Sequence, residues 1–125
     1  MSAVVEGAAC RANISGPGRR RRAAVAAVFG LISLGALCAA VALGASGPWR
    51  LSVGLPAAAA AISGLQVRRN TCVAHAATGS FEHEDFTTTK VEAAFAEASR
   101  RVAATIVRDG VLVGVAVSVL AVLLP

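Results

Sequence analysis

Residues 23–45 read AAVAAVFGLISLGALCAAVALGA, a run of 23 residues without a charged side chain. At about 1.5 Å per residue, an α-helix of this length crosses the roughly 30 Å hydrocarbon core of a bilayer. A cleaved signal peptide is the main alternative, because four arginines precede the run. The run is longer than the apolar part of a signal peptide, so we interpret it as a retained transmembrane helix.

The composition of the whole chain agrees with a membrane location. Hydrophobic residues make up 56% of the 125 residues and charged residues 15%, and the mean hydropathy is +0.69. A soluble domain of this size has a large surface for its volume and needs more charge than that. We therefore expect an all-α integral membrane protein with two or three transmembrane helices.

A second, weaker span is expected over residues 51–67, which read LSVGLPAAAAAISGLQV. It is alanine-rich and contains Pro56, which membrane helices tolerate. The connector before it, SGPW, is short and turn-like, and Trp49 suits the membrane–water interface. Residues 23–67 are therefore predicted to form a transmembrane helical hairpin.

The third span is expected within residues 87–125. Its apolar part, GVLVGVAVSVLAVLL over residues 110–124, is short for a full crossing. The residues before it recur at helical spacing, and Thr89 and Glu92 fit a capping box. We expect an amphipathic helix that lies at the cytoplasmic surface from Thr87 and bends near Gly110 into the span. A straight helix that projects from the membrane is the alternative.

Arginine placement predicts the orientation. Arginines lie before the first span, after the second and before the third, which puts them on one side of the membrane: Arg19, Arg20, Arg21, Arg22, Arg68, Arg69, Arg100 and Arg101. By the positive-inside rule, residues 1–22 form a disordered basic cytoplasmic tail, residues 68–86 a polar cytoplasmic loop, and the C-terminus lies outside. A bacterial inner membrane fits best. An organellar membrane stays open, because residues 1–22 also have some features of a transit peptide.

Two groups of residues are candidates for function. Gly110, Gly114 and Ser118 are small residues spaced by four, a pattern that lets helices approach closely in lipid. Cys72 and His75 are three apart and share a helix face, and His83 follows closely, so these three are candidate ligands of a soft metal. Four such ligands would complete a structural zinc site, and this segment supplies three.

No motif of catalysis is present, and we expect a non-enzymatic protein without catalytic residues or a cofactor-binding motif, its cofactor unknown. Nucleic-acid binding is excluded because no aromatic residue interleaves with the arginines. The expected partners are membrane lipid and other membrane-protein subunits. Three functions remain open: an accessory subunit of a larger membrane complex, a metal- or thiol-handling protein that uses Cys72 and His75, and an oligomeric channel or transporter lined by Asp109.

Overall fold

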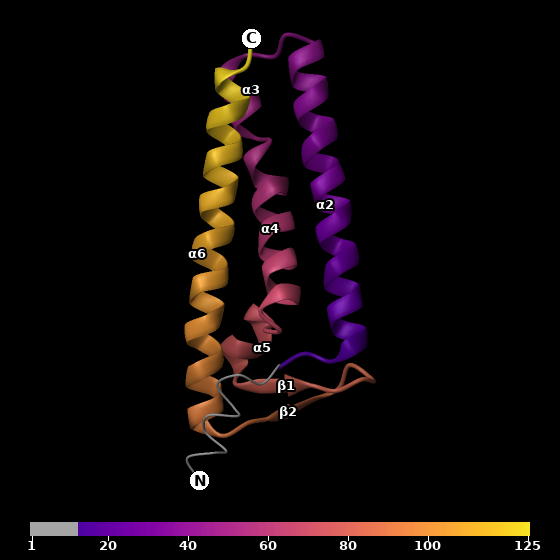
Figure 1. Cartoon of the computed structure of the whole chain (residues 1–125), viewed down its shortest axis with the longest axis vertical. Helices are drawn as coiled ribbons and strands as arrows, with labels where there is room; N and C mark the ends of the chain where they lie inside the picture. The colour runs from indigo at the N-terminus through magenta and orange to yellow at the C-terminus, as the bar shows by residue number, and fades with distance from the viewer. Residues whose placement is uncertain (1–12) are drawn as a thin grey trace.

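The computed structural model describes residues 13–125; Cys10 and the first twelve residues of the predicted tail lie outside the described part. Three long helices run side by side: α2 (Gly16–Ala42), α4 (Gly54–Arg68) and α6 (Ala93–Leu123). The central helix, α4, packs against both others (Figure 1). The fold is therefore mostly helical, as predicted. Of these helices, α2 and α6 are long and apolar enough to cross a membrane, judged by length and composition.

The first helix begins earlier than the apolar run. Ser15 is its N-cap, and the Ser15 hydroxyl accepts a hydrogen bond from the Gly18 amide at 3.0 Å. Pro17 lies in the first turn, where a backbone N–H has no partner within the helix. The N–H that proline lacks therefore breaks no hydrogen bond. Arg19 to Arg22 consequently form the first turns of α2. The predicted disordered tail is wrong for these residues, because the cap extends the helix through the arginines.

At the opposite end of the bundle, the SGPW connector continues into a short helix, α3 (Gly47–Leu51). Trp49 is 72% exposed there. Pro56 falls in the first turn of α4, where its missing N–H breaks no hydrogen bond. The helical hairpin expected over residues 23–67 therefore has α2 and α4 as its limbs and α3 at its turn.

Residues 68–86, the predicted polar loop, and the residues that follow them to position 92 are more structured than predicted. They contain a short helix, α5 (Val73–Thr78), and two antiparallel strands, β1 (Ser80–Glu82) and β2 (Thr88–Lys90). We call α5, β1 and β2 the foot; Figure 1 shows it across the lower end of the helices. Gly79 ends α5 in the left-handed conformation, at φ 66°, which glycine adopts without a steric cost.

The start predicted for the last helix, at Thr87, is wrong. The backbone of Thr88–Lys90 pairs with β1, so the helix begins only at Ala93. Glu92 is its N-cap and makes no side-chain capping bond, so the capping box of Thr89 and Glu92 does not form. Sheet pairing holds Thr89 opposite Phe81, and the Thr89 hydroxyl contacts His83 instead.

The last helix, α6, is continuous through Gly110. Figure 1 shows α6 as one unbroken helix. Its lower half does not present its apolar stripe to lipid as predicted. Phe95 and Ala103 are buried, and Ile106 is fully so, where α6 packs against α5 and α4. Of the stripe that had been assigned to the membrane surface, Phe95 and Ile106 are therefore covered within the chain, whereas Val91, Ala98 and Val102 are half-buried.

Side-chain size differs between the inside and the outside of the bundle. Small residues fill the contacts between helices, among them Ser33, Ala57, Ser63, Gly110 and Ala121. The outward faces of the bundle carry large aliphatic side chains instead; Leu31, Leu55 and Leu120 are 70%, 75% and 60% exposed. A water-soluble helical bundle has the opposite distribution, because burial of large apolar side chains drives its folding.

Candidate functional site

A buried polar cluster joins the lower end of α2 to the foot. Its centre is Glu82 of β1, which is only 3% exposed. The Glu82 carboxylate accepts hydrogen bonds from the Ser15 amide and hydroxyl at 3.3 and 3.0 Å. It also lies 3.2 Å from Nε2 of His75 and 3.6 Å from the Arg22 guanidinium. The start of α2 and the foot, which are distant in sequence, thus meet on one carboxylate.

The charge state of Glu82 follows from these contacts. Burial by itself would raise the pKa of this carboxyl group, because it penalises the charged form. The hydrogen bonds from His75 and Ser15, together with the positive charge of Arg22, outweigh burial and hold the Glu82 pKa below its ordinary value. The carboxylate is therefore ionised at neutral pH and tightly held.

Cys72 belongs to the same cluster. Its side chain is buried, and its sulfur accepts a hydrogen bond from Arg22 at 2.8 Å. The fully buried Asn13 side chain makes two hydrogen bonds to the Cys72 backbone. Its amide group donates to the Cys72 carbonyl at 3.1 Å, and its oxygen accepts from the Cys72 N–H at 2.6 Å. Arg22 consequently bridges the thiol and the carboxylate.

The predicted metal ligands are only partly brought together. Cys72 and His75 lie in one cluster, but Cys72 contacts Arg22 and His75 contacts Glu82. His83 lies apart, 3.0 Å from the Thr89 hydroxyl and edge-on to Phe81. Over residues 13–125, no three His, Cys, Asp or Glu side chains are grouped to hold a metal ion. Nor does any buried side-chain nitrogen or oxygen of that range lack a partner. The contacts described above join the start of α2 to the foot, and we call them the latch: they connect Asn13, Ser15 and Arg22 with Cys72, His75 and Glu82.

All three predicted packing residues of α6 lie against α4. A Cβ atom on Gly110 would overlap the side chain of Ile62, and one on Gly114 would lie 2.7 Å from Cβ of Ala58. The Ser118 hydroxyl donates to the Leu51 carbonyl at 2.8 Å. Across the interface, a Cβ on Gly54 would meet Ser118 and the Gly114 carbonyl. The two helix backbones approach so closely that only small residues fit between them.

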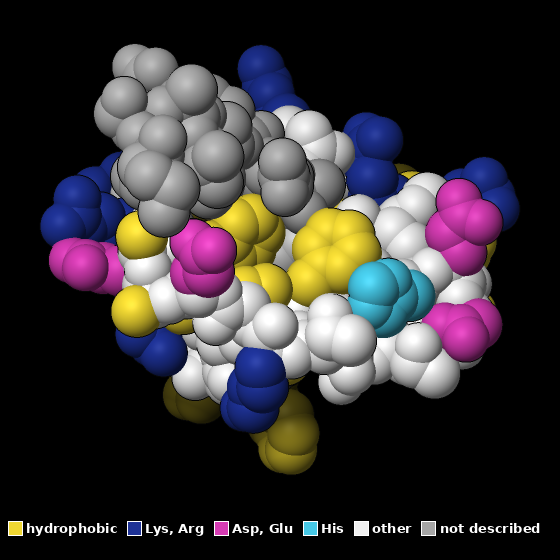
Figure 2. All heavy atoms as spheres, turned by 90° about the horizontal axis from the view of Figure 1, so that it is seen from below, with side chains coloured by type: hydrophobic (Ala, Val, Ile, Leu, Met, Phe, Trp, Pro, Cys, Tyr) yellow, Lys and Arg dark blue, Asp and Glu magenta, His cyan; other side chains and the backbone are white. Residues whose placement is uncertain are grey.

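Charges at the two ends of the bundle are used differently. At the lower end, Asp109 pairs with Arg69 at 2.6 Å and with Arg108 at 2.9 Å, so its charge is neutralised within the chain. Seen from below, basic side chains lie on several sides of this end of the molecule (Figure 2). At the upper end, Arg50 is buried and donates to the carbonyls of Ala45, Ala121 and Leu124. Arg50 therefore caps the C-terminus of α6.

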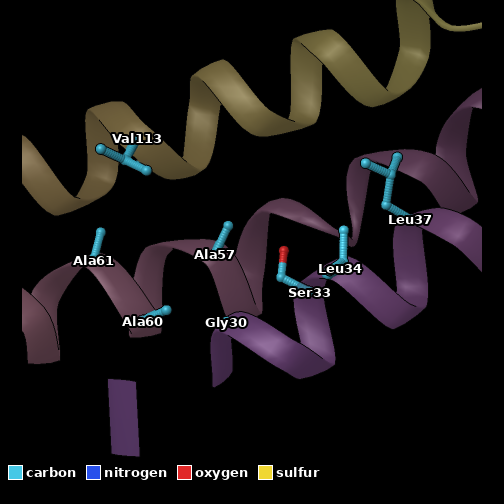
Figure 3. A pocket seen from close by; sticks show the side chains of 8 residues that line it. All are labelled: Gly30, Ser33, Leu34, Leu37, Ala57, Ala60, Ala61 and Val113. Atoms are coloured by element: carbon cyan, nitrogen blue, oxygen red, sulfur yellow. The ribbon is translucent and has the colours of Figure 1, made fainter. Parts of the chain in front are cut away.

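One open groove runs along the bundle between α2 and α6. Alanines of α4 form its floor, Gly30 and Ser33 of α2 line one side, and Val113 of α6 lines the other (Figure 3). The Ser33 hydroxyl is turned inward, where it donates to the Val53 carbonyl at 3.1 Å. The groove is thus apolar and has a floor of small side chains.

No family model matches this chain, and no curated protein or solved structure is significantly similar to it.

Proposed function

We propose that this chain is a small, non-catalytic integral membrane protein that packs as an accessory subunit against a larger membrane complex. The membrane location is supported by the distribution of side chains: small ones lie inside the bundle, and large apolar ones face outward. In the most apolar 18 residues of α2, only 6% of the residues are buried within the chain, and in those of α6 only 22%. A core helix of a soluble protein would bury most of such a surface. Lipid is the solvent that suits it.

The length of the helices supports the same proposal. From Ala23 to Ala42, α2 offers 20 uncharged helical residues, which span about 30 Å, the thickness of the hydrocarbon core. Arg22, Arg69 and Arg108 lie where the apolar parts of the three long helices end. Trp49 lies at the other end, exposed as an interfacial anchor would be.

The latch argues against a cleaved leader. Ser15 and Arg22 of α2 bind Glu82, and Ser33 binds the backbone before α4. Removal of α2 would leave the buried Glu82 carboxylate without two of its partners, which is costly in a protein interior. A retained first span is the arrangement consistent with these contacts.

The orientation belongs to the proposal as well. Arg50, the arginine at the upper end, is occupied in capping α6. The exposed arginines are at the lower end, so we place the foot in the cytoplasm and the α3 end outside. A bacterial inner membrane is the location that fits best.

The open groove supports the accessory role. Its floor of Ala57, Ala60 and Ala61 and the bare Gly30 leave room for another helix to approach closely. Small residues at helix interfaces serve this purpose in lipid, where the hydrophobic effect does not drive helices together. Inside the chain, the same kind of surface already joins α4 to α6.

Copurification with a matched pair of variants tests the subunit role. Ala60→Leu fills the groove, whereas Ala39→Leu adds the same side chain to an exposed position of α2. Ala39 lies nine residues, or about two and a half helical turns, from Gly30 and so on the opposite face. We expect a stoichiometric partner that copurifies with the wild type and with Ala39→Leu but is lost from Ala60→Leu. Equal recovery with all three chains would contradict the assignment of the groove.

Membrane insertion has an independent test in the single tryptophan. Trp49 fluorescence in reconstituted vesicles should be quenched by lipids that carry a nitroxide near the headgroup and less by lipids labelled at the end of the acyl chain. Fluorescence that neither lipid quenches would contradict insertion of this end of the bundle.

A further inference from the structure

A second groove, between α5 and α6, is unlike the first because charged side chains accompany its apolar floor. Val73 and Ala77 of α5 and Ala104 and Val107 of α6 line it, and Arg100 and Arg108 flank it. Each arginine is four residues from Ala104, so the three side chains follow one ridge of α6. The two arginines are about 12 Å apart along the helix axis. The groove thus offers an apolar bed with a guanidinium group at each end.

Both guanidinium groups have donors to spare. Within residues 13–125, Arg100 takes part in no ion pair or side-chain hydrogen bond. Arg108 uses only its Nε, in the bond to Asp109. Since Arg69 also binds that carboxylate at 2.6 Å, a net positive charge remains at this end of the groove. The planar fork of arginine is well suited to the oxygens of a phosphate.

The position of the groove relative to the apolar spans indicates the source of the phosphate. The Arg69–Asp109 pair marks the end of α4 and the lower limit of the apolar part of α6. Above this level, Val111 and Val115 are exposed on α6, and below it the groove begins. In the membrane, the groove would open at headgroup depth, and acyl chains could lie along the exposed valines.

We propose that the α5–α6 groove is a binding site for one anionic phospholipid. Arg100 and Arg108 hold the phosphate-bearing headgroup, Val73, Ala77 and Ala104 lie beneath that headgroup, and the acyl chains extend along the exposed valines of α6. Basic pockets beside membrane helices on the cytoplasmic side recognise such lipids. This inference rests on the membrane location proposed above and adds a lipid class and a site to it.

Native mass spectrometry of the full chain in detergent tests this site. The probes are phosphatidylglycerol, phosphatidylcholine with the same acyl chains, and inorganic phosphate. We expect the wild type to prefer phosphatidylglycerol. The double variant Arg100→Gln/Arg108→Gln should bind it about 30-fold more weakly, since each basic residue near an anionic headgroup contributes about a factor of five. Ala104→Leu, which keeps both charges and fills the bed, should also weaken binding.

The control is Arg19→Gln/Arg20→Gln, which removes the same charge from exposed positions of α2. Unchanged affinity in this control is expected. An equal loss in the two double variants would overturn the site, because the attraction would then be diffuse. Wild-type affinity in the Arg100/Arg108 variant, or phosphate bound as tightly as the lipid, would overturn it too. A partner protein lost from that variant while lipid affinity is unchanged would instead assign the groove to protein.

Failure of this site and failure of the membrane proposal are distinguishable through Trp49, which lies at the opposite end. If headgroup-labelled lipid quenches Trp49 in the wild type and in the Arg100/Arg108 variant, both chains are inserted, and a missing lipid preference overturns only the site. A wild type whose Trp49 is not quenched would overturn the membrane location and the lipid site with it.

Discussion

Gly114 is the position at which the close approach of α4 and α6 is tested most sharply. A methyl group added there lies 2.7 Å from Cβ of Ala58 and 2.9 Å from the carbonyl oxygen of Gly54. Carbon atoms in contact prefer about 3.5–4.0 Å, so Gly114→Ala forces the helices about 1 Å apart. Overpacking of this kind costs about 1–3 kcal/mol, against a gain of about 1 kcal/mol from the higher helix propensity of alanine.

The net effect of Gly114→Ala is therefore a loss of about 0–2 kcal/mol, and Gly114→Leu should lose more than about 3 kcal/mol. The larger side chain also breaks the neighbouring contacts of Gly110 and Gly54, which share the same interface. Val115→Leu is the control, since Val115 is 55% exposed on the same helix. Unfolding by sodium dodecyl sulfate in mixed micelles gives the ranking. If Gly114→Leu and Val115→Leu unfold at the same detergent fraction, the α4–α6 interface is assigned wrongly.

Three further predictions concern the ends of the bundle. The Glu82 pKa lies below its ordinary value of 4.5 in the folded chain, so the contribution of Glu82 to stability is complete above that pH and falls as the pH drops through the folded pKa. Glu82→Gln should therefore flatten the curve of unfolding against acid pH. An unchanged curve would count against the latch. Asn13→Ala leaves the buried Cys72 N–H without a partner and removes one of the two donors to the Cys72 carbonyl, which keeps the Ala76 N–H. Thermal unfolding should show a loss of about 1–3 kcal/mol, whereas a smaller loss would mean that water replaces the side chain. Arg50→Met removes the cap of α6, so hydrogen exchange should speed up after Ala121 but not in the foot; faster exchange throughout would indicate global loosening instead.

The parts of the fold that could be predicted are those decided by local sequence. The charge-free run around Phe29 and the small-residue spacing of Gly110 and Gly114 each act over one helix, so the long apolar helices and the packing residues could be predicted from them. The foot could not be predicted. Its hairpin turns through Phe86 at φ 66°, a conformation for which glycine or asparagine is the usual signal. Without that signal, Thr89 and Glu92 resembled the start of a helix.

The candidate site could be predicted from the sequence only in part, for a related reason. The spacing of Cys72 and His75 placed them together, but it could not show which side chains they would meet. Ser15 and Glu82 are 67 residues apart, and Arg22 and Cys72 are 50 apart. Such pairs form only because the foot folds back on α2. Hydrophobic patterning would have turned Phe81 inward, whereas Ser80 and Glu82 are the buried residues of this strand.

Cys38 offers the most direct test of the central claim that lipid covers the outward faces of the bundle. The Cys38 side chain lies in the apolar part of α2, about one turn before the helix ends at Ala42, and is exposed in the isolated chain. In native membranes, in a background with Cys10→Ser and Cys72→Ser, a charged maleimide should leave Cys38 unlabelled while it labels an added Glu84→Cys in the foot. Denaturation should then make Cys38 reactive. Labelling of Cys38 in intact membranes as fast as that of Glu84→Cys would contradict the account, because water would then reach the face assigned to lipid.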